Sequence, residues 1–287
     1  MGYRQDRNIT KEVPHYRRML IYLTPDRDAA SLFTTQTFDL SKTLPWIEEY
    51  NETAEHKLTL LQLFVLAVGR AIAETPRINR YVSGKRIYQR DGTYISVSTK
   101  KKLVDTAKVV LLKVPIEPGM QVEEMQKSWH SLLGEGRSGK DIHQEKETKL
   151  FLRVPGFMLS LAIKLVRWLD ARHWLPGFMT DPDPMYTSCV MANLGSVGLA
   201  AGYHHLYEYG NCPFFTVIGR VRQDPVAVDG EVEIRPRVDM KITFDERVED
   251  GLTAGLGLAK VKDYIEDPGT IRSGATNWEG KPPQNLG

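Results

Sequence analysis

Cysteine is scarce in this chain, which has only Cys189 and Cys212 among its 287 residues. Two cysteines cannot build a disulfide framework. A zinc site made of cysteine and histidine needs closer, repeated spacing than this sequence offers. We therefore expect no metal site, and a reducing cytoplasm is the simplest location for such a chain.

An excess of one charge is also lacking, since 38 Lys and Arg residues face 36 Asp and Glu residues and the net charge is +2. A nucleic-acid-binding surface needs basic residues gathered on one face. The run from Lys100 to Lys102 is short and is typical of a solvated strand end. The first residues contain no apolar stretch of the signal-peptide type, which again favours the cytoplasm. We expect neither a nucleic-acid partner nor export.

No apolar run is long enough to span a bilayer. Residues 58–74 form the most apolar segment, which is too short and too interrupted for a membrane span and predicts a buried helix ended by Pro76. Further helices are predicted at 122–133, at 252–265 and at 41–50, the last with Ser41 as its N-cap.

Alternating patterns predict strands early in the chain and a series of strands late in it. The expected strands are residues 34–40, 80–87, 93–98, 109–114, 188–191, 214–221, 226–228, 232–234 and 238–244. Asp91-Gly92 is a two-residue hairpin signal between the second and third of these. Helices and strands that alternate early, with strands that run together late, indicate an α/β (α+β) fold whose mixed β-sheet is flanked by helices.

The domain organisation follows from composition. We expect an N-terminal arm at 1–30, one main domain at 31–268 with a helical insertion at about 140–186, and a flexible tail at 269–287. The tail is rich in Gly, Pro and polar residues, which favours an extended or disordered chain.

The insertion contains one strongly patterned segment, from Phe157 to Leu169. Its apolar residues surround Lys164 and Arg167, which predicts an amphipathic helix and excludes a membrane span. The most ordinary interpretation is a helix packed on the domain or on a neighbouring subunit. The alternatives are contact with a membrane surface or a lid over a hydrophobic acyl pocket.

The stretch with the clearest chemical potential is Ile242 to Gly251. Its alternation predicts a strand that delivers Asp245 and Glu246 at its end, before a turn at Asp250-Gly251 and a helix. Glu246 and Asp250 are two acids four positions apart at this corner. Such a pair would suit a general base with a structural partner. The alternative is a polar turn in which Asp250 accepts hydrogen bonds from backbone N–H groups.

The same stretch resembles the signature Asp-His-Arg-x-x-Asp-Gly of the superfamily of chloramphenicol acetyltransferase and the 2-oxo acid dehydrogenase dihydrolipoamide acyltransferases. Asp245, Arg247, Asp250 and Gly251 match, and Glu246 stands where the family has its catalytic His. The run Ala192-Asn193-Leu194-Gly195 resembles the family's Ser-Asn-Leu-Gly. Residues 76–79 and 217–220 continue the match, as do Pro225, Val228 and Arg235-Pro236. The resemblance covers about residues 30–265, the acyltransferase-like catalytic domain alone, with no lipoyl domain expected in this chain.

The resemblance implies a homotrimer with active sites at the subunit interfaces, where coenzyme A and an acyl acceptor enter from opposite sides. The family's His removes a proton from the acceptor, and a hydroxyl before Asn-Leu-Gly stabilises the oxyanion. Here Glu246 replaces the base, and Ala192, followed by Asn193, replaces the hydroxyl. We therefore predict a trimeric non-catalytic or altered-function member, a pseudoenzyme, in which Asp250 pairs with Arg17 or Arg18.

The alternative is an active transferase that moves acyl groups from coenzyme A to a small-molecule acceptor with a non-standard base. Glu246 would be one such base. His204 and His205 follow a Gly-containing turn and would be another, although a histidine pair with aromatic neighbours is also typical of packing. Coenzyme A or acyl-coenzyme A would then be the substrate, without a metal.

Overall fold

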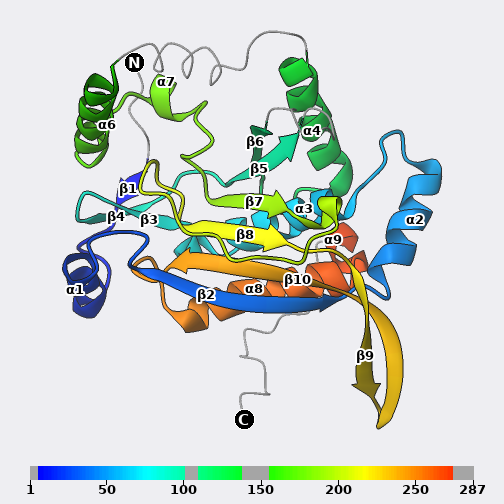
Figure 1. The fold of residues 1–287 in the computed structure, drawn as a ribbon. Helices are drawn as coiled ribbons and strands as arrows, with labels where there is room; N and C mark the ends of the chain where they lie inside the picture. The colour runs from blue at the N-terminus through cyan, green and yellow to red at the C-terminus, as the bar shows by residue number, and fades with distance from the viewer. Residues whose placement is uncertain (1–5, 101–108, 138–154, 274–287) are drawn as a thin grey trace.

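The fold is known from a computed structural model that describes residues 6–100, 109–137 and 155–273 (Figure 1). Its main element is a seven-stranded mixed sheet in the order β2-β10-β8-β7-β5-β6, with β9 paired to β10. The strands are β2 (Ser31–Asp39), β5 (Tyr94–Lys100), β6 (Val109–Pro115), β7 (Cys189–Asn193), β8 (Phe214–Ile218), β9 (Arg222–Val228) and β10 (Glu231–Asp245). β7 runs parallel to β5 and to β8, and the other pairs are antiparallel. The predicted fold class is confirmed.

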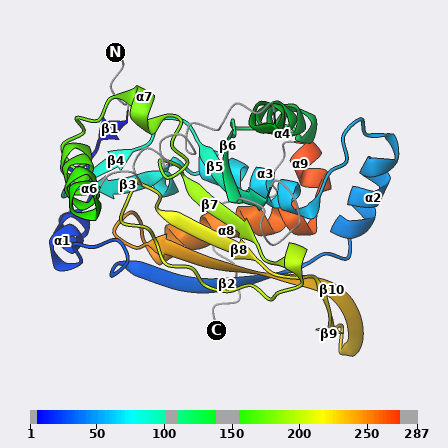
Figure 2. The same ribbon diagram turned by 45° about the horizontal axis from the view of Figure 1, so that its top comes forward.

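A second, three-stranded sheet has the order β1-β4-β3, formed by Arg7–Asn8, Arg86–Gln89 and Arg80–Ser83. The helices are α1 (His15–Leu23), α2 (Thr43–Thr53), α3 (Leu60–Ala73), α4 (Val122–Arg137), α6 (Gly156–Asp170), α7 (Gly177–Thr180), α8 (Gly251–Glu266) and α9 (Gly269–Ser273). Short 3-10 turns occupy Pro76–Ile78 and Gly195–Val197. Figure 2 shows α3 and α8 together on one side of the main sheet.

The core lies between the main sheet and the helices α3 and α8. Thr59 and Gln62 form a reciprocal capping box that starts α3, and nearly every later residue of this helix is buried. Met240, Ile242 and Phe244 alternate along β10 with residues of the opposite face; the first two join the same core, and Phe244 is also buried. The alternation read from the sequence therefore assigns the faces of β10 correctly.

The predicted hairpin at Asp91-Gly92 is wrong, and so is the single strand predicted at 80–87, which is two strands, β3 and β4. β3 and β4 form the hairpin, and they turn at Gly84 and Lys85, which both have positive φ (52° and 65°) as a tight two-residue turn requires. A Cβ added to Gly84 would lie 2.0 Å from the carbonyl oxygen of Ala171, so this glycine also permits close packing. Asp91-Gly92 instead connects the small sheet to the main one.

The boundaries differ from prediction at further places. The strands predicted at 232–234 and 238–244 are one strand, β10, and the strand predicted at 214–221 ends at Ile218. α2 begins at Thr43 after Lys42, so Ser41 is not its N-cap. The predicted N-terminal arm contains an ordered strand and helix, β1 and α1. The predicted flexible tail starts with a helix, α9, in which Ile271 is fully buried and accepts a hydrogen bond from Arg70 through its carbonyl. The rest of the tail, like part of the insertion (138–154), lies outside the described residues.

The amphipathic helix predicted in the insertion is α6. Leu159, Ala162, Val166 and Leu169 are its less exposed apolar residues, whereas the outer face carries Phe157, Met158, Leu161, Leu165 and Trp168, each at least 46% exposed. Figures 1 and 2 place α6 at the same end of the molecule as α1, where β10 finishes. None of the described helices is long and apolar enough to cross a membrane.

Candidate functional site

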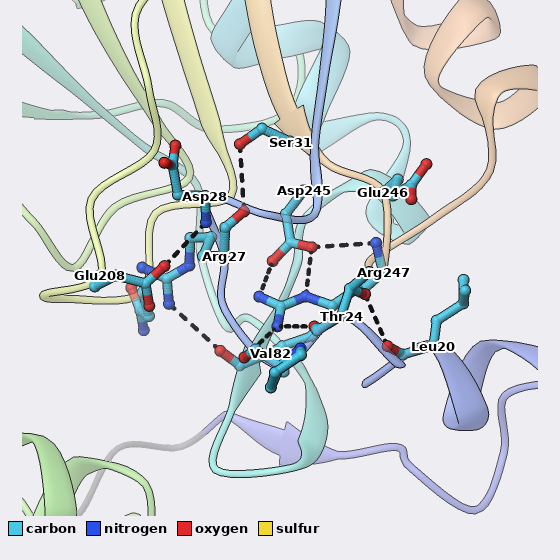
Figure 3. A network of polar contacts seen from close by, with 12 residues as sticks. Leu20, Thr24, Arg27, Asp28, Ser31, Val82, Glu208, Asp245, Glu246 and Arg247 are labelled. Atoms are coloured by element: carbon cyan, nitrogen blue, oxygen red, sulfur yellow. Dashed lines mark hydrogen bonds and ion pairs between the residues drawn. The ribbon is translucent and has the colours of Figure 1, made fainter. Parts of the chain in front are cut away.

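The turn after β10 is built on a buried ion pair. The carboxylate of Asp245 accepts two hydrogen bonds of 2.8 Å from the guanidinium of Arg247, and both side chains are almost inaccessible (Figure 3). Arg247 also donates to the carbonyl oxygens of Thr24 and Pro25, each at 2.9 Å. Burial alone would lower the pKa of Arg247, but the hydrogen bonds and charge of Asp245 outweigh it and raise that pKa. The pair therefore ties the end of β10 to the segment after α1.

Asp250 starts α8 as its N-cap and accepts a hydrogen bond of 2.8 Å from the backbone N–H of Thr253. Its other oxygen lies 3.6 Å from Arg17, so of the two candidate arginines Arg17 is the partner. The hydrogen bond from Thr253 lowers the pKa of Asp250, the charge of Arg17 adds to this, and partial burial opposes it. Both the capping and the ion-pair predictions are confirmed.

Glu249 is a residue that sequence reasoning missed. It is buried and forms ion pairs with three arginines, Arg17 at 3.1 Å, Arg77 at 3.0 Å and Arg80 at 2.8 Å. These arginines come from α1 and from the segment around β3, far away in sequence, so no local pattern reveals the cluster. Ion pairs of Asp245 and of Glu249 therefore fix the turn on both sides of Glu246.

Glu246 lies at that centre with its backbone fixed and its side chain turned outward. Its N–H donates to the carbonyl of Ala30 at 3.0 Å, and its own carbonyl accepts from Arg17 at 3.2 Å. Figure 3 shows its carboxylate pointing away from Asp245 and Arg247. The half-buried carboxylate forms no hydrogen bond or ion pair with any described residue, so it is available to solvent or to a ligand.

Ala192 and Asn193 lie at the other end of the main sheet. Asn193 orders the following 3-10 turn, because its side-chain oxygen accepts from the N–H of Ser196 at 3.2 Å. Ala192 pairs with Val217, which pairs with Lys241, and Glu246 is five residues further along the chain. At about 3.3 Å per residue and 4.8 Å per strand, Ala192 is separated from Glu246 by roughly 16 Å along the strand and 10 Å across it. One chain does not bring these two positions together.

His204 lies on the sheet face that also carries Ala192. Its ring stacks on Phe215 with centroids 3.9 Å apart, its Nδ1 is 2.8 Å from the carbonyl oxygen of His205, and its own carbonyl accepts from the hydroxyl of Thr243. His205 is exposed and stacks on His204. Neither ring has a carboxylate partner within the described part of the chain. The contacts match the packing interpretation of the pair.

No group of three or more His, Cys, Asp or Glu residues in the described chain has the geometry to hold a metal ion. Cys189 and Cys212 are free and buried. Burial raises the pKa of both thiols, which makes them poor nucleophiles. The chemistry of the site therefore depends on the turn after β10 and on the end of β7.

A mixed sheet backed by α3 and α8, with an Asp-x-Arg-x-x-Asp-Gly turn between its long strand and the following helix, places the chain among acyltransferase-like folds. The chain belongs to the family of the 2-oxoacid dehydrogenases acyltransferase (catalytic domain), whose model matches residues 17–143 and 186–272. Helices α6 and α7 fall between the two matched ranges.

Among curated relatives, the succinyltransferase component of the Saccharomyces cerevisiae 2-oxoglutarate dehydrogenase complex is 25% identical over 84% of this chain and 43% of its own length. A Bartonella vinsonii succinyltransferase component is 24% identical over 84% of this chain and 49% of its own length. The matched part of this chain thus spans less than half of either relative.

Among solved structures, a probable dihydrolipoamide acetyltransferase from Listeria monocytogenes has a TM-score of 0.59, with 15% identity, 88% of this chain covered and 89% of that one. A chloramphenicol acetyltransferase has a TM-score of 0.57 with 13% identity, covering 91% and 100% of the two chains. The cubic core of a pyruvate dehydrogenase complex has a TM-score of 0.56 with 12% identity, covering 92% and 91%. These similarities establish the fold.

The buried pair gives a stability prediction. Replacing Arg247 with Met leaves Asp245 charged, buried and unpaired, which we expect to cost about 3–5 kcal/mol of unfolding free energy. The control is Arg222→Met, which removes an arginine paired with Asp224 and Asp239 at a more exposed position. This variant should lose at most about 1 kcal/mol. Urea unfolding followed by circular dichroism measures both, and equal losses would contradict the role given to Arg247.

Proposed function

We propose that this chain is a homotrimeric member of the family that keeps the fold and the turn of the acyltransferases but lacks their proton and oxyanion chemistry. The observation that carries this is the pair of side chains at the two chemical positions, a carboxylate at Glu246 and a methyl group at Ala192. A methyl group donates no hydrogen bond, and losing one oxyanion donor typically costs about 10²–10³ in rate. A carboxylate is also a weaker base toward a thiol than an imidazole.

The geometry of the turn supports this proposal. Among the described residues, the interactions that order the turn use residues other than Glu246, or use its backbone. The side chain at this position is therefore free to change without loss of the scaffold. The alternative, an active coenzyme A-linked acyltransferase with Glu246 as base, is favoured by one feature, the outward carboxylate with no described partner (Figure 3).

The trimer is proposed from two features of the described chain. The first is the separation of Ala192 from Glu246, because a site that uses both strand ends must combine them from two copies. The second is the exposed apolar side chains of Phe33, Leu199 and Tyr203, with Phe33 and Tyr203 in edge-to-face contact. Exposed apolar groups of this kind mark interaction surfaces. The similarity to the cubic core agrees with such assembly.

Coenzyme A and its thioesters are the proposed ligands of the interface site, and a small molecule is the proposed acyl acceptor in the active alternative. A reducing cytoplasm remains our proposal for the compartment, and its support is the presence of two free, buried thiols.

The oligomeric state is tested by light scattering of the purified protein at micromolar concentration. We expect the mass of a trimer, and we expect Leu199→Asp to shift the protein toward monomers because it places a charge in the apolar contact. The matched control is Leu165→Asp on α6, which should remain trimeric. A monomeric wild-type protein would refute the trimer, and dissociation by Leu165→Asp would instead assign the interface to α6.

The proposed loss of acyl-transfer activity is tested by mass spectrometry, which detects transfer from acetyl-coenzyme A to a panel of thiols, amines and alcohols. Calorimetry measures the binding of coenzyme A in parallel. We expect no turnover by the wild-type chain and measurable transfer by the double variant Glu246→His, Ala192→Ser, since it restores a base and an oxyanion donor. Each single variant is the control for the pair. Wild-type turnover that Glu246→Gln abolishes would establish the active alternative.

Membrane-surface contact through residues 157–169 is the less favoured alternative to packing on the domain or on a neighbouring subunit, and it would use the outer face of α6. Apolar side chains such as Leu161 and Leu165 lie beside the exposed Lys164 and Arg167, a composition suited to an anionic bilayer surface. If this alternative holds, sedimentation with phosphatidylglycerol vesicles carries the wild type down, but not the variant Leu161→Asp, Leu165→Asp. Leu199→Asp should still bind. Absence of wild-type sedimentation would leave α6 without a membrane role.

A further inference from the structure

An apolar cavity of about 190 Å³ lies between the main sheet and the helices α3 and α8. Its walls include Met240, Ile242 and Phe244 of β10, Ile72 of α3 and Leu258 of α8. The side chains in the lining that carry a hydroxyl or a thiol are Thr34, Thr216 and Cys189, and the last two contact each other at 3.6 Å. The walls therefore offer almost no hydrogen bonds to water.

The cavity exists because α8 has small residues where it faces the sheet. Gly251, Ala254, Gly255 and Leu258 line the cavity, and their spacing of i, i+3, i+4 and i+7 places them on one face of the helix. A Cβ added to Gly255 would meet no atom within 4 Å, whereas one added to Gly257 would lie 2.7 Å from Ile78. Gly257 thus serves close packing, whereas the space around the exposed Gly255 is open and continuous with the cavity that this residue lines.

The position of the cavity relates it to the turn described above. Phe244 and Gly251 line it and directly flank the segment from Asp245 to Asp250. Leu32 of β2, 37% exposed, and Gly255 of α8, which is also exposed, lie on its outer side. The cavity therefore extends from the sheet–helix core to the surface at Leu32 and Gly255, and the two residues that flank the turn line it.

The volume and the lining select the class of ligand. An apolar cavity of about 150 Å³ remains dry and is large enough to bind benzene, a ligand of six carbons. A ligand for the present cavity must be slender, because it has to pass between β2 and α8, and must lack polar groups along the part that is buried. A saturated hydrocarbon chain meets both conditions.

We propose that this cavity binds the hydrocarbon chain of an acyl group of medium length, about six to eight carbons. The polar end of the ligand lies at the surface near Glu246, as a free carboxylate or as a coenzyme A thioester. The thioester source rests on the proposed function, whereas the binding of the chain itself depends only on the cavity. No bond is made or broken in this step.

Calorimetry with two ligand series tests this, saturated fatty acids of four to twelve carbons and their coenzyme A thioesters, with coenzyme A alone as the reference. Burial of each further methylene should increase affinity about fourfold, from about 0.8 kcal/mol per CH₂, until the cavity is full, after which affinity levels off. If affinity rises with chain length and then levels off only for the fatty acids, the ligand is the free acid. Tighter binding of the thioesters identifies acyl-coenzyme A.

Two variants and one matched control locate the binding. Gly255→Leu and, independently, Ala254→Leu place a side chain in the cavity and should weaken binding of the eight-carbon ligand at least tenfold. Gly134→Leu is the control, because Gly134 is also a helical glycine whose added Cβ meets nothing within 4 Å, but it lies in α4, away from the cavity. All three proteins are first shown to be folded by circular dichroism.

The proposal is overturned if affinity in the wild type is the same at every chain length, or if both cavity variants keep the wild-type dependence on chain length. Neither outcome depends on turnover. Acyl transfer by the wild type, which would overturn the proposed lack of chemistry, leaves the cavity assignment unchanged. The two proposals therefore fail separately.

Discussion

The buried ion pair between Asp245 and Arg247 is the interaction on which the rest of the site depends. Two charges removed from water are stable only when they satisfy each other and their remaining hydrogen-bonding groups find partners. Arg247 meets this condition by binding the carbonyls of Thr24 and Pro25 as well as Asp245. The chain after α1 is thereby fixed to the end of β10, which places Arg17 of α1 against Glu249 and Asp250.

This arrangement separates the scaffold of the turn from its chemistry. The scaffold consists of charges that pair within one chain, and it holds the backbone of residue 246 whatever side chain stands there. The chemistry of the acyltransferase family needs particular side chains at positions 246 and 192. These two positions lie at opposite ends of the sheet. A chain can therefore retain the family's fold and turn after both groups have changed, which is why membership in the family does not decide activity here.

Local patterns in the sequence were sufficient for much of this description. The alternation along β10, the cap at Asp250 and the apolar helix α3 all depend on neighbouring residues, and each was predicted. The hairpin was misplaced because Asp91-Gly92 has the stronger turn composition, whereas Gly84-Lys85 is selected by packing against Ala171. Ile271 and the arginine cluster at Glu249 depend on contacts between distant segments. No periodicity or spacing within one segment records such contacts.

The cavity follows from the same separation of binding from chemistry. Binding a hydrocarbon chain requires only apolar walls and free volume, which the small face of α8 provides without any contribution from Glu246 or Ala192. A packed core normally fills such space, because unfilled volume forfeits dispersion contacts and lowers stability. The unfilled space beside the turn therefore lowers the stability of the fold. A ligand that enters it restores those contacts, so acyl-chain binding would stabilise the protein whether or not the acyl group is ever transferred.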